Sequence, residues 1–133
     1  MIKRILVASV ARSDFSIVQP VINRFTQSKK FVVSKIISTT DYLDEGYETG
    51  SNQFNKDDFL ITNNLKNDSP EEVNQVISNI IRQSSKIFYK FKPDLLILTG
   101  DRYEMLSMAV ASISFNLPIA HIHGGETSLG SFD

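Results

Sequence analysis

The stretch "DLLILTGDRYEMLSMAVASISFNLPIAHI", residues 94–122, decides the fold. It opens with an apolar run, residues 94–98, of the kind found in strands covered on both faces. Residues 102–115 follow as a helix that is apolar nearly all round, which predicts burial on both of its sides. A second strand-like run, residues 118–122, closes the unit. This order predicts two parallel strands joined by a right-handed crossover.

The amino-terminal part of the chain continues the same alternation. Apolar, β-prone runs predict strands over residues 5–10 and 31–38. Between them, Ser13 and Asp14 are favoured at a helix N-cap, and apolar residues recur after them at helical spacing. Pro20 falls inside this pattern, so the helix is expected to begin late or to bend there.

Residues 39–68 are the least regular part of the sequence. They are rich in Asp, Glu, Asn and Gly, which predicts a long surface loop with short elements. Ser69 then suits an N-cap, and the proline and two glutamates after it are typical of a first helical turn. We expect the helix that starts there to end at Pro93.

Four strands therefore alternate with three helices. The fold class that this predicts is α/β, a three-layer, Rossmann-like parallel sheet. A chain of 133 residues has room for one domain with a real core and not for two, so we expect a single domain over residues 1–133. Ligands of such sheets bind beyond the carboxyl ends of the strands.

The composition excludes several classes of function. A net charge of −1, with no Lys/Arg cluster interleaved with aromatic residues, argues against nucleic acid and anionic membranes as partners. Without cysteine, the chain has no disulfide, thiolate metal site or cysteine nucleophile. The run 5–10 is too short for a signal peptide, and no run approaches the roughly 20 apolar residues of a membrane span. We expect a cytoplasmic protein.

Three polar clusters follow predicted strands, at residues 11–16, 99–104 and 121–133. In the first, Arg12 beside a helix start suits a phosphate or carboxylate. The alternative is a solvated Arg12 with Asp14 serving only as a cap. The G-x-G-x-x-G sequence of dinucleotide-binding folds is absent.

The second cluster is the turn "TGDRYE". Gly100 permits a tight turn from strand to helix, and we expect Asp101 in the first turn of that helix. An acid is favoured there by the helix dipole, so capping and a catalytic function both stay open for Asp101. Arg102 has two possible partners, Glu104 or a group on another loop.

The third cluster is "HIHGGETSLGSFD". His121 and His123 are two residues apart on a predicted strand, so they are expected to point the same way. With Glu126 they suggest either a metal site or acid–base work, but strand spacing alone does not bring three ligands together, and we expect no metal. His121 lies inside the strand and is the better candidate for a structural histidine. Gly124 and Gly125 allow backbone to approach a ligand closely.

Three segments together resemble one enzyme family. They are "ARSDFSIVQPVI", "KPDLLILTGDRYEMLSMAVA" and "NLPIAHIHGGETSLGSFD". The family is that of the hydrolysing UDP-N-acetylglucosamine 2-epimerases, which open sialic acid and legionaminic acid biosynthesis. The Gly-Asp-Arg and His-x-x-Gly-Gly-Glu elements carry the resemblance, which is weakest over residues 39–68.

The resemblance implies a GT-B-like fold, in which two Rossmann-like domains hold the nucleotide sugar between them. Family members are much longer than this chain, so the chain is expected to be the amino-terminal domain of a truncated two-domain enzyme. The missing carboxy-terminal domain would carry most uridine and diphosphate contacts. The resemblance also implies a homo-oligomer when the protein is full length.

The implied reaction is an anti-elimination of UDP across C1–C2, followed by addition of water to give free ManNAc. It needs no redox cofactor and no metal. Carried over by position, the catalytic residues are Asp101, His123 and Asp133. The substrate-binding residues are Arg12, Ser16, Arg102, Gly124, Gly125 and Glu126, with Arg12 and Ser16 at positions that touch UDP.

Two departures from the family pattern matter. Some members carry a catalytic glutamate at the position of His123, and an imidazole can shuttle a proton there instead. Many members also show Gly-x-His-Leu after the second strand, where this chain has "STTDYLDEG". The division of catalytic roles among Asp101, His123 and Asp133 therefore stays open.

The histidine version of the motif resembles a bacterial branch that includes enzymes acting on UDP-2,4-diacetamido-2,4,6-trideoxyglucose. UDP-GlcNAc and this sugar nucleotide both stay open as substrates. Two other classes of function also stay open: half of a GT-B-like glycosyltransferase, and a non-catalytic nucleotide-sugar-binding module.

Overall fold

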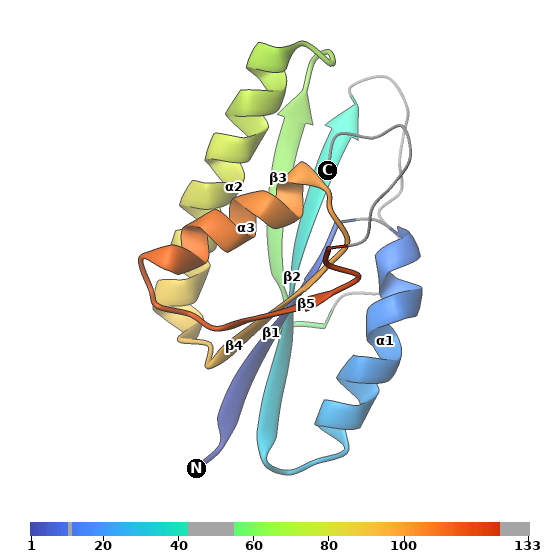
Figure 1. Cartoon of the computed structure of the whole chain (residues 1–133), viewed down its shortest axis with the longest axis vertical. Helices are drawn as coiled ribbons and strands as arrows, with labels where there is room; N and C mark the ends of the chain where they lie inside the picture. Colours follow the sequence, from blue (N-terminus) through green and yellow to red (C-terminus); the bar gives the residue numbers. More distant parts are fainter. Residues whose placement is uncertain (11, 43–54, 126–133) are drawn as a thin grey trace.

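The computed structural model of the chain describes residues 1–10, 12–42 and 55–125. Within them the chain forms one sheet with helices on both faces (Figure 1). The strands are β1 (Lys3–Ser9), β2 (Phe31–Tyr42), β3 (Phe59–Leu65), β4 (Leu95–Thr99) and β5 (Ile119–Ile122). The helices are α1 (Arg12–Thr26), α2 (Pro70–Phe91) and α3 (Tyr103–Ile113). The predicted α/β fold class is confirmed.

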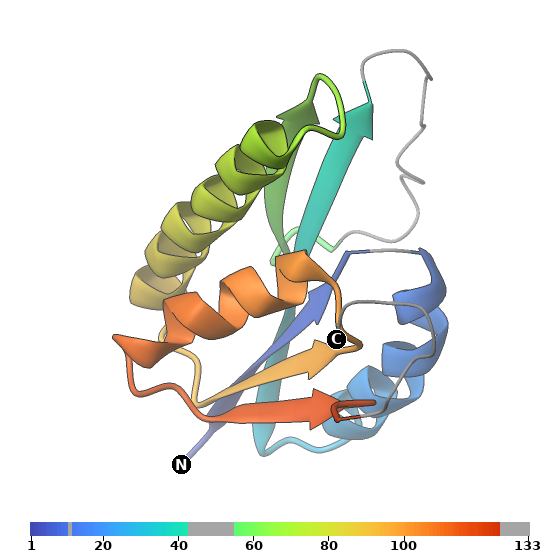
Figure 2. The same ribbon diagram turned by 45° about the horizontal axis from the view of Figure 1, so that its top comes forward.

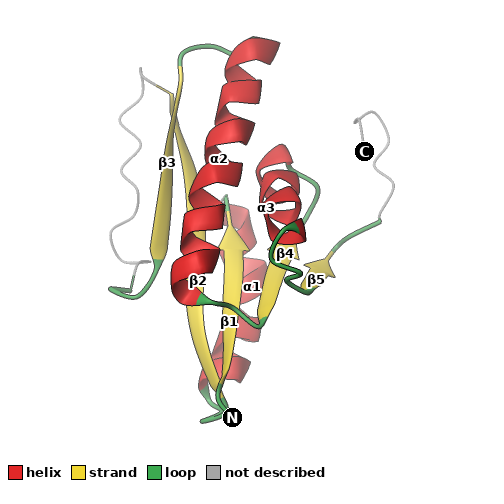
Figure 3. Ribbon diagram, turned by 90° about the vertical axis from the view of Figure 1, so that its left-hand side faces the viewer, coloured by secondary structure: helices red, strands yellow, loops and turns green. Residues whose placement is uncertain are grey.

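The strand order is β3-β2-β1-β4-β5, and every neighbouring pair is parallel. α1 covers one face of the sheet, and α2 and α3 cover the other, as Figures 1 and 3 show. The chain builds the sheet outward from β1 to β3 on one side and then adds β4 and β5 on the other. All carboxyl ends therefore lie at one edge of the sheet, and the strand order switches direction between β1 and β4.

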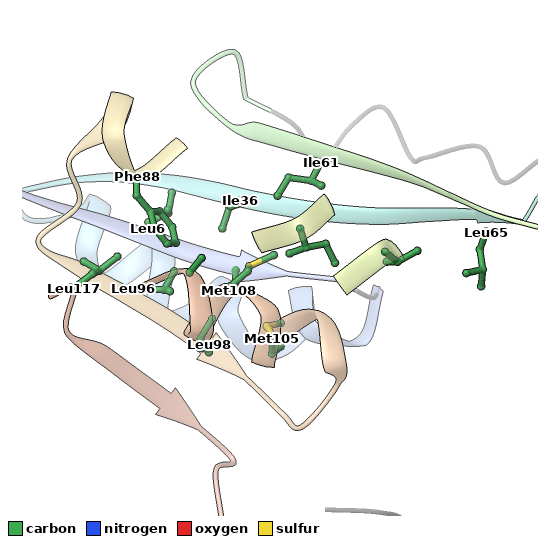
Figure 4. Packing of buried hydrophobic residues seen from close by; sticks show 14 residues of the cluster. Leu6, Ile36, Ile61, Leu65, Phe88, Leu96, Leu98, Met105, Met108 and Leu117 are labelled. Atoms are coloured by element: carbon green, nitrogen blue, oxygen red, sulfur yellow. The ribbon is translucent and has the colours of Figure 1, made fainter. Parts of the chain in front are cut away.

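The larger hydrophobic core lies between the sheet and the helices α2 and α3 (Figure 4). Its fully buried members include Leu6, Ile36 and Leu96 from the sheet and Phe88 and Met108 from the helices. Each such side chain contributes about 1.5–3 kcal/mol by leaving water. A smaller cluster fills the α1 face and consists of Ile5, Val7, Val18, Ile22 and Ile97.

The start and end of α2 follow the sequence prediction. Ser69 is the N-cap, and its hydroxyl accepts a hydrogen bond from the backbone N–H of Glu72 at 3.3 Å. Lys92 caps the other end in the left-handed region, with φ of 53°, and its N–H donates to the Phe88 carbonyl. The sequence left open that the first helix begins late, near Pro20. This alternative is wrong, because α1 begins at Arg12 and continues through Pro20.

The prediction of a long loop over residues 39–68 is wrong in two places. β2 continues to Tyr42, and β3 forms a seven-residue edge strand over Phe59–Leu65. In β3 alternate residues are buried, and one of them is Asn63, whose amide donates to Ser38 Oγ at 3.0 Å. Polar residues inside this strand conceal its period-two pattern, since their hydrogen-bond partners lie elsewhere in the sequence.

The prediction that α3 is buried on both sides is also wrong. Its inner face packs on α2 and β4, but Leu106, Val110 and Ile113 are 62%, 43% and 72% exposed. Nothing in the described part of the chain covers this outer face. Even so, no described helix is both long enough and apolar enough to cross a membrane.

Candidate functional site

The carboxyl ends of β1, β4 and β5 lie at one edge of the sheet (Figure 2). The chain leaves β1 toward α1 and β4 toward α3, on opposite faces of the sheet. Open α/β sheets bind ligands where two such connections diverge. The second and third polar clusters predicted from the sequence begin at this edge, and α1, which carries the described part of the first, follows β1 there.

The turn after β4 is held to the end of β5. Gly100 adopts a positive φ of 74°, and its N–H donates to the Ile122 carbonyl at 3.0 Å. The Nε2 atom of His121 lies 2.6 Å from the Gly100 carbonyl oxygen, so the imidazole donates its hydrogen there. The expected structural role of His121 is confirmed.

His123 lies outside β5, which ends at Ile122. Its φ of 58° is left-handed, so the expectation that His121 and His123 point the same way as neighbours on a strand is wrong. A Cβ at Gly124 would overlap the His121 ring, and Gly125 has a φ of 78°. The close approach made by Gly124 is therefore to the His121 ring.

Asp101 is exposed and lies one residue before the N-cap of α3, which is Arg102. The expectation that Asp101 sits in the first turn of this helix is wrong, since α3 begins only at Tyr103. Arg102 adopts extended backbone and makes no side-chain cap hydrogen bond. The turn that begins at Gly100 therefore places Asp101 at the edge of the sheet where the strands end.

Arg102 and Glu104 form a two-point ion pair. Nε of Arg102 donates to Oε2 of Glu104 at 3.2 Å, and Nη2 donates to Oε1 at 2.8 Å. The Glu104 side chain is 3% exposed and the Arg102 side chain 51%. This hydrogen bonding raises the pKa of Arg102, against the opposing effect of burial. Of the two partners that the sequence left open for Arg102, the structure shows Glu104.

Asp14, in the first polar cluster, is hydrogen-bonded to the residue that follows β1. It is buried in the first turn of α1, and its Oδ2 accepts a hydrogen bond from the Val10 N–H at 3.0 Å. Its negative charge is among the influences that raise the pKa of Arg102. It is the smallest of these influences, and the hydrogen bond to Glu104 is the largest.

Two buried hydroxyls lie beneath this edge. Ser9 ends β1 and Thr99 ends β4, and among the described residues their hydroxyl oxygens have no hydrogen-bond partner. The β1–β4 ladder pairs Val7 with Ile97, so the same register places both hydroxyls on the α1 face. Unsatisfied buried polar groups are rare in folded proteins. They add to the polar character of the switch point.

Ser16 is exposed on α1 and lines a cavity of about 480 Å³ on the β2 side of that helix. The cavity is also lined by Lys35 and Asp58, a buried ion pair with an N–O distance of 3.2 Å. The structure thus groups Ser16 with this pair. The sequence analysis missed Lys35 and Asp58 because one lies in an apolar strand and the other in the irregular region.

Three predicted site positions cannot be placed. The side chain of Arg12, and the whole of Glu126 and Asp133, lie outside the described residues. Within the described ranges, no three His, Asp or Glu side chains gather as metal ligands would.

The parallel sheet and its flanking helices define a Rossmann-like α/β fold with a switch point between β1 and β4, the place where open sheets of this class bind ligands. The chain belongs to the UDP-N-acetylglucosamine 2-epimerase family, whose model matches residues 24–133. The family expected from the resemblance is confirmed.

Two curated relatives are hydrolysing 2-epimerases. The chain is 33% identical over 132 residues to the UDP-N,N'-diacetylbacillosamine 2-epimerase of Legionella pneumophila, covering 96% of this chain and 35% of that protein. It is 29% identical over 135 residues to the GDP/UDP-N,N'-diacetylbacillosamine 2-epimerase of Campylobacter jejuni, covering 98% of this chain and 35% of that protein. The chain therefore spans about a third of the length of these relatives.

A solved structure confirms the fold. The UDP-GlcNAc 2-epimerase of Neisseria meningitidis, bound to UDP-GlcNAc, superposes with a TM-score of 0.73 at 18% identity. The match covers 96% of this chain and 34% of that one. The described sheet thus corresponds to one part of the GT-B-like fold of these enzymes.

Proposed function

We propose that this chain is the amino-terminal domain of a two-domain, hydrolysing UDP-sugar 2-epimerase. The single observation that carries the proposal is a hydrogen bond that joins the turn after β4 to the end of β5. The hydrogen bond from His121 to Gly100 brings the Asp101 turn and the His123 turn together at the ligand-binding edge. Family membership and the greater length of the relatives support it.

In the proposed first step, a base removes the C2 proton of the sugar while the C1–O bond to UDP breaks. The C2–H electrons form a C1=C2 double bond, and UDP leaves with the bond electrons. Water then adds its hydroxyl to C1, and a proton returns to the opposite face of C2. The net change is UDP-sugar plus water to UDP plus the free 2-epimer, so the reaction involves no net oxidation or reduction.

Asp101 and His123 are the candidate proton carriers of these steps. Both are exposed, and they follow adjacent strands. A carboxylate and an imidazole supply a base and an acid near neutral pH. Asp133 is the third candidate on the family pattern, and its part in the division of roles stays a prediction.

The proposed substrate contacts come from all three polar clusters. Arg102 presents a half-exposed guanidinium at the start of α3, suited to the diphosphate. Arg12, Ser16, Gly124, Gly125 and Glu126 complete the proposed set. A cytoplasmic location and a homo-oligomeric full-length enzyme also stay predictions.

Two sugar nucleotides are candidate substrates. UDP-GlcNAc, with ManNAc as the product, follows from the family as a whole. The names of the two curated relatives favour UDP-N,N'-diacetylbacillosamine, which is the UDP-2,4-diacetamido-2,4,6-trideoxyglucose that the sequence left open as the other substrate.

The test is turnover by the full-length protein carrying Asp101→Asn, assayed for UDP and the free sugar. Loss of a general acid or base lowers kcat by roughly 100-fold or more. The matched control is Asp57→Asn, an exposed acid in the turn before β3. Near-wild-type turnover by Asp101→Asn overturns the role given to Asp101.

A further inference from the structure

We propose that Glu104 is a positioning residue of this site, which acts on the bound UDP leaving group by holding the guanidinium of Arg102. The identity of the ligand rests on the proposed function. The geometry of the pair is independent of it.

The contact has the geometry of a clamp. Both carboxylate oxygens of Glu104 are used, one on Nε and one on Nη2 of Arg102, so the plane of the guanidinium is fixed. The partners are two positions apart in the sequence, and Glu104 is held in the first turn of α3. A flexible arginine on a surface turn is thereby given one orientation.

The buried position of the Glu104 carboxylate carries a free-energy cost. Glu104 is 2% exposed and is the only charged residue in α3. The other side chains of this helix are apolar or carry a hydroxyl group. Burying a carboxylate is unfavourable, and its pairing with a half-exposed arginine offsets only part of the cost. If packing alone mattered, an apolar residue at this position would give a more stable fold than Glu104.

Helix capping does not explain the pair either. α2 begins with Ser69, whose hydroxyl caps the helix, and carries its first-turn Glu71 on the surface. The N-cap residue of α3 is Arg102, which makes no side-chain cap hydrogen bond. The acid in the first turn of α3 is therefore directed to the arginine.

The held guanidinium keeps donors for a ligand. A guanidinium has five N–H groups, and the clamp uses one on Nε and one on Nη2. Among the described residues the other N–H groups donate to no partner, and half of the side chain is exposed. A planar donor array of this kind matches the oxygens of a diphosphate.

The experiment is a double-mutant cycle in the full-length enzyme, with Glu104→Gln, Arg102→Ala and the pair, each assayed well below its melting temperature. In Glu104→Gln we expect kcat/KM and UDP affinity by calorimetry each to fall about tenfold, because one charge-assisted contact is lost. In the Arg102→Ala background the same change should cost nothing further. Glu71→Gln, on the first turn of α2, is the control and should leave both values unchanged.

A second readout does not depend on activity. In wild-type protein the Arg102 Nε–H should give a slowly exchanging NMR signal, and Glu104→Gln should lose it. Additive losses in the cycle, or an unchanged Nε–H signal, overturn the proposal. Wild-type protein that binds UDP but releases no sugar overturns the proposed function alone, because the UDP titrations still test the positioning.

Discussion

The Nε2 atom of His121 lies 2.6 Å from the carbonyl oxygen of Gly100, so a side chain of β5 holds the turn that follows β4. The same turn is bound by its backbone, from the Gly100 N–H to the Ile122 carbonyl. Residues 21 positions apart in sequence are thus fixed at one edge. Asp101 and His123 are the side chains that follow these two fixed points.

Gly124→Ala should break this arrangement, because its Cβ would overlap the His121 ring. We expect a loss of roughly 1–3 kcal/mol in the free energy of unfolding from the displaced hydrogen bond and the overlap. In a His121→Ala background the added methyl has room, so the same substitution should cost much less. Urea denaturation of the four proteins measures the difference, and equal costs in both backgrounds would contradict the contact.

Asn63→Ala should destabilise the edge of the sheet. Its amide donates to Ser38 Oγ and accepts from Asn79 Nδ2 at 2.8 Å, so its removal leaves polar groups unpaired. We expect about 1–3 kcal/mol lower stability. Asn64→Ala, its exposed neighbour on the other face of β3, is the matched control and should change little. Similar effects from the two variants would refute the burial pattern of β3.

The two faces of α3 should differ in their tolerance of truncation. Met108 is fully buried, so Met108→Ala is expected to cost about 2–5 kcal/mol. Ile113 is 72% exposed, so Ile113→Ala should cost under about 1 kcal/mol in this chain. Thermal or urea unfolding checks both. A large cost at Ile113 would mean that its outer face is covered in solution.

Asp94 should contribute to the pH dependence of stability. Hydrogen bonds from Lys3 Nζ and the Arg4 N–H, each 2.8 Å long, lower the pKa of Asp94 below its ordinary value of 3.8. A lowered folded pKa means that the contribution is present above the unfolded pKa and is lost as pH falls through the folded one. Asp94→Asn should therefore flatten the fall in unfolding free energy below about pH 4. A variant profile parallel to wild type would contradict this.

Much of the fold could be predicted, because continuous apolar runs mark the central strands and capping residues mark the ends of α2. The strands β1, β4 and β5 and the helix α2 follow from period and capping residues alone. β3 could not be found in this way, because buried Asn63 is satisfied by Ser38 and Asn79, which only the folded chain brings near. The exposed face of α3 could not be predicted either, since the sequence does not show whether an apolar residue such as Ile113 is covered by another part of the protein.

The positions of the candidate residues Asp101 and His123 in the fold could be predicted, but their local geometry could not. Strand ends are visible in sequence, so Asp101 and His123 could be assigned to one edge. The left-handed backbone of His123 and the buried clamp of Glu104 on Arg102 depend on tertiary contacts. Sequence spacing does not encode either one.

The central claim is tested most directly by incubating the full-length protein with each candidate UDP-sugar in D₂O and following the products by NMR. The account predicts release of UDP with the free 2-epimer, carrying deuterium at C2 because the returning proton comes from solvent. Release of UDP with unlabelled sugar of unchanged configuration, or no turnover of either substrate, would contradict it.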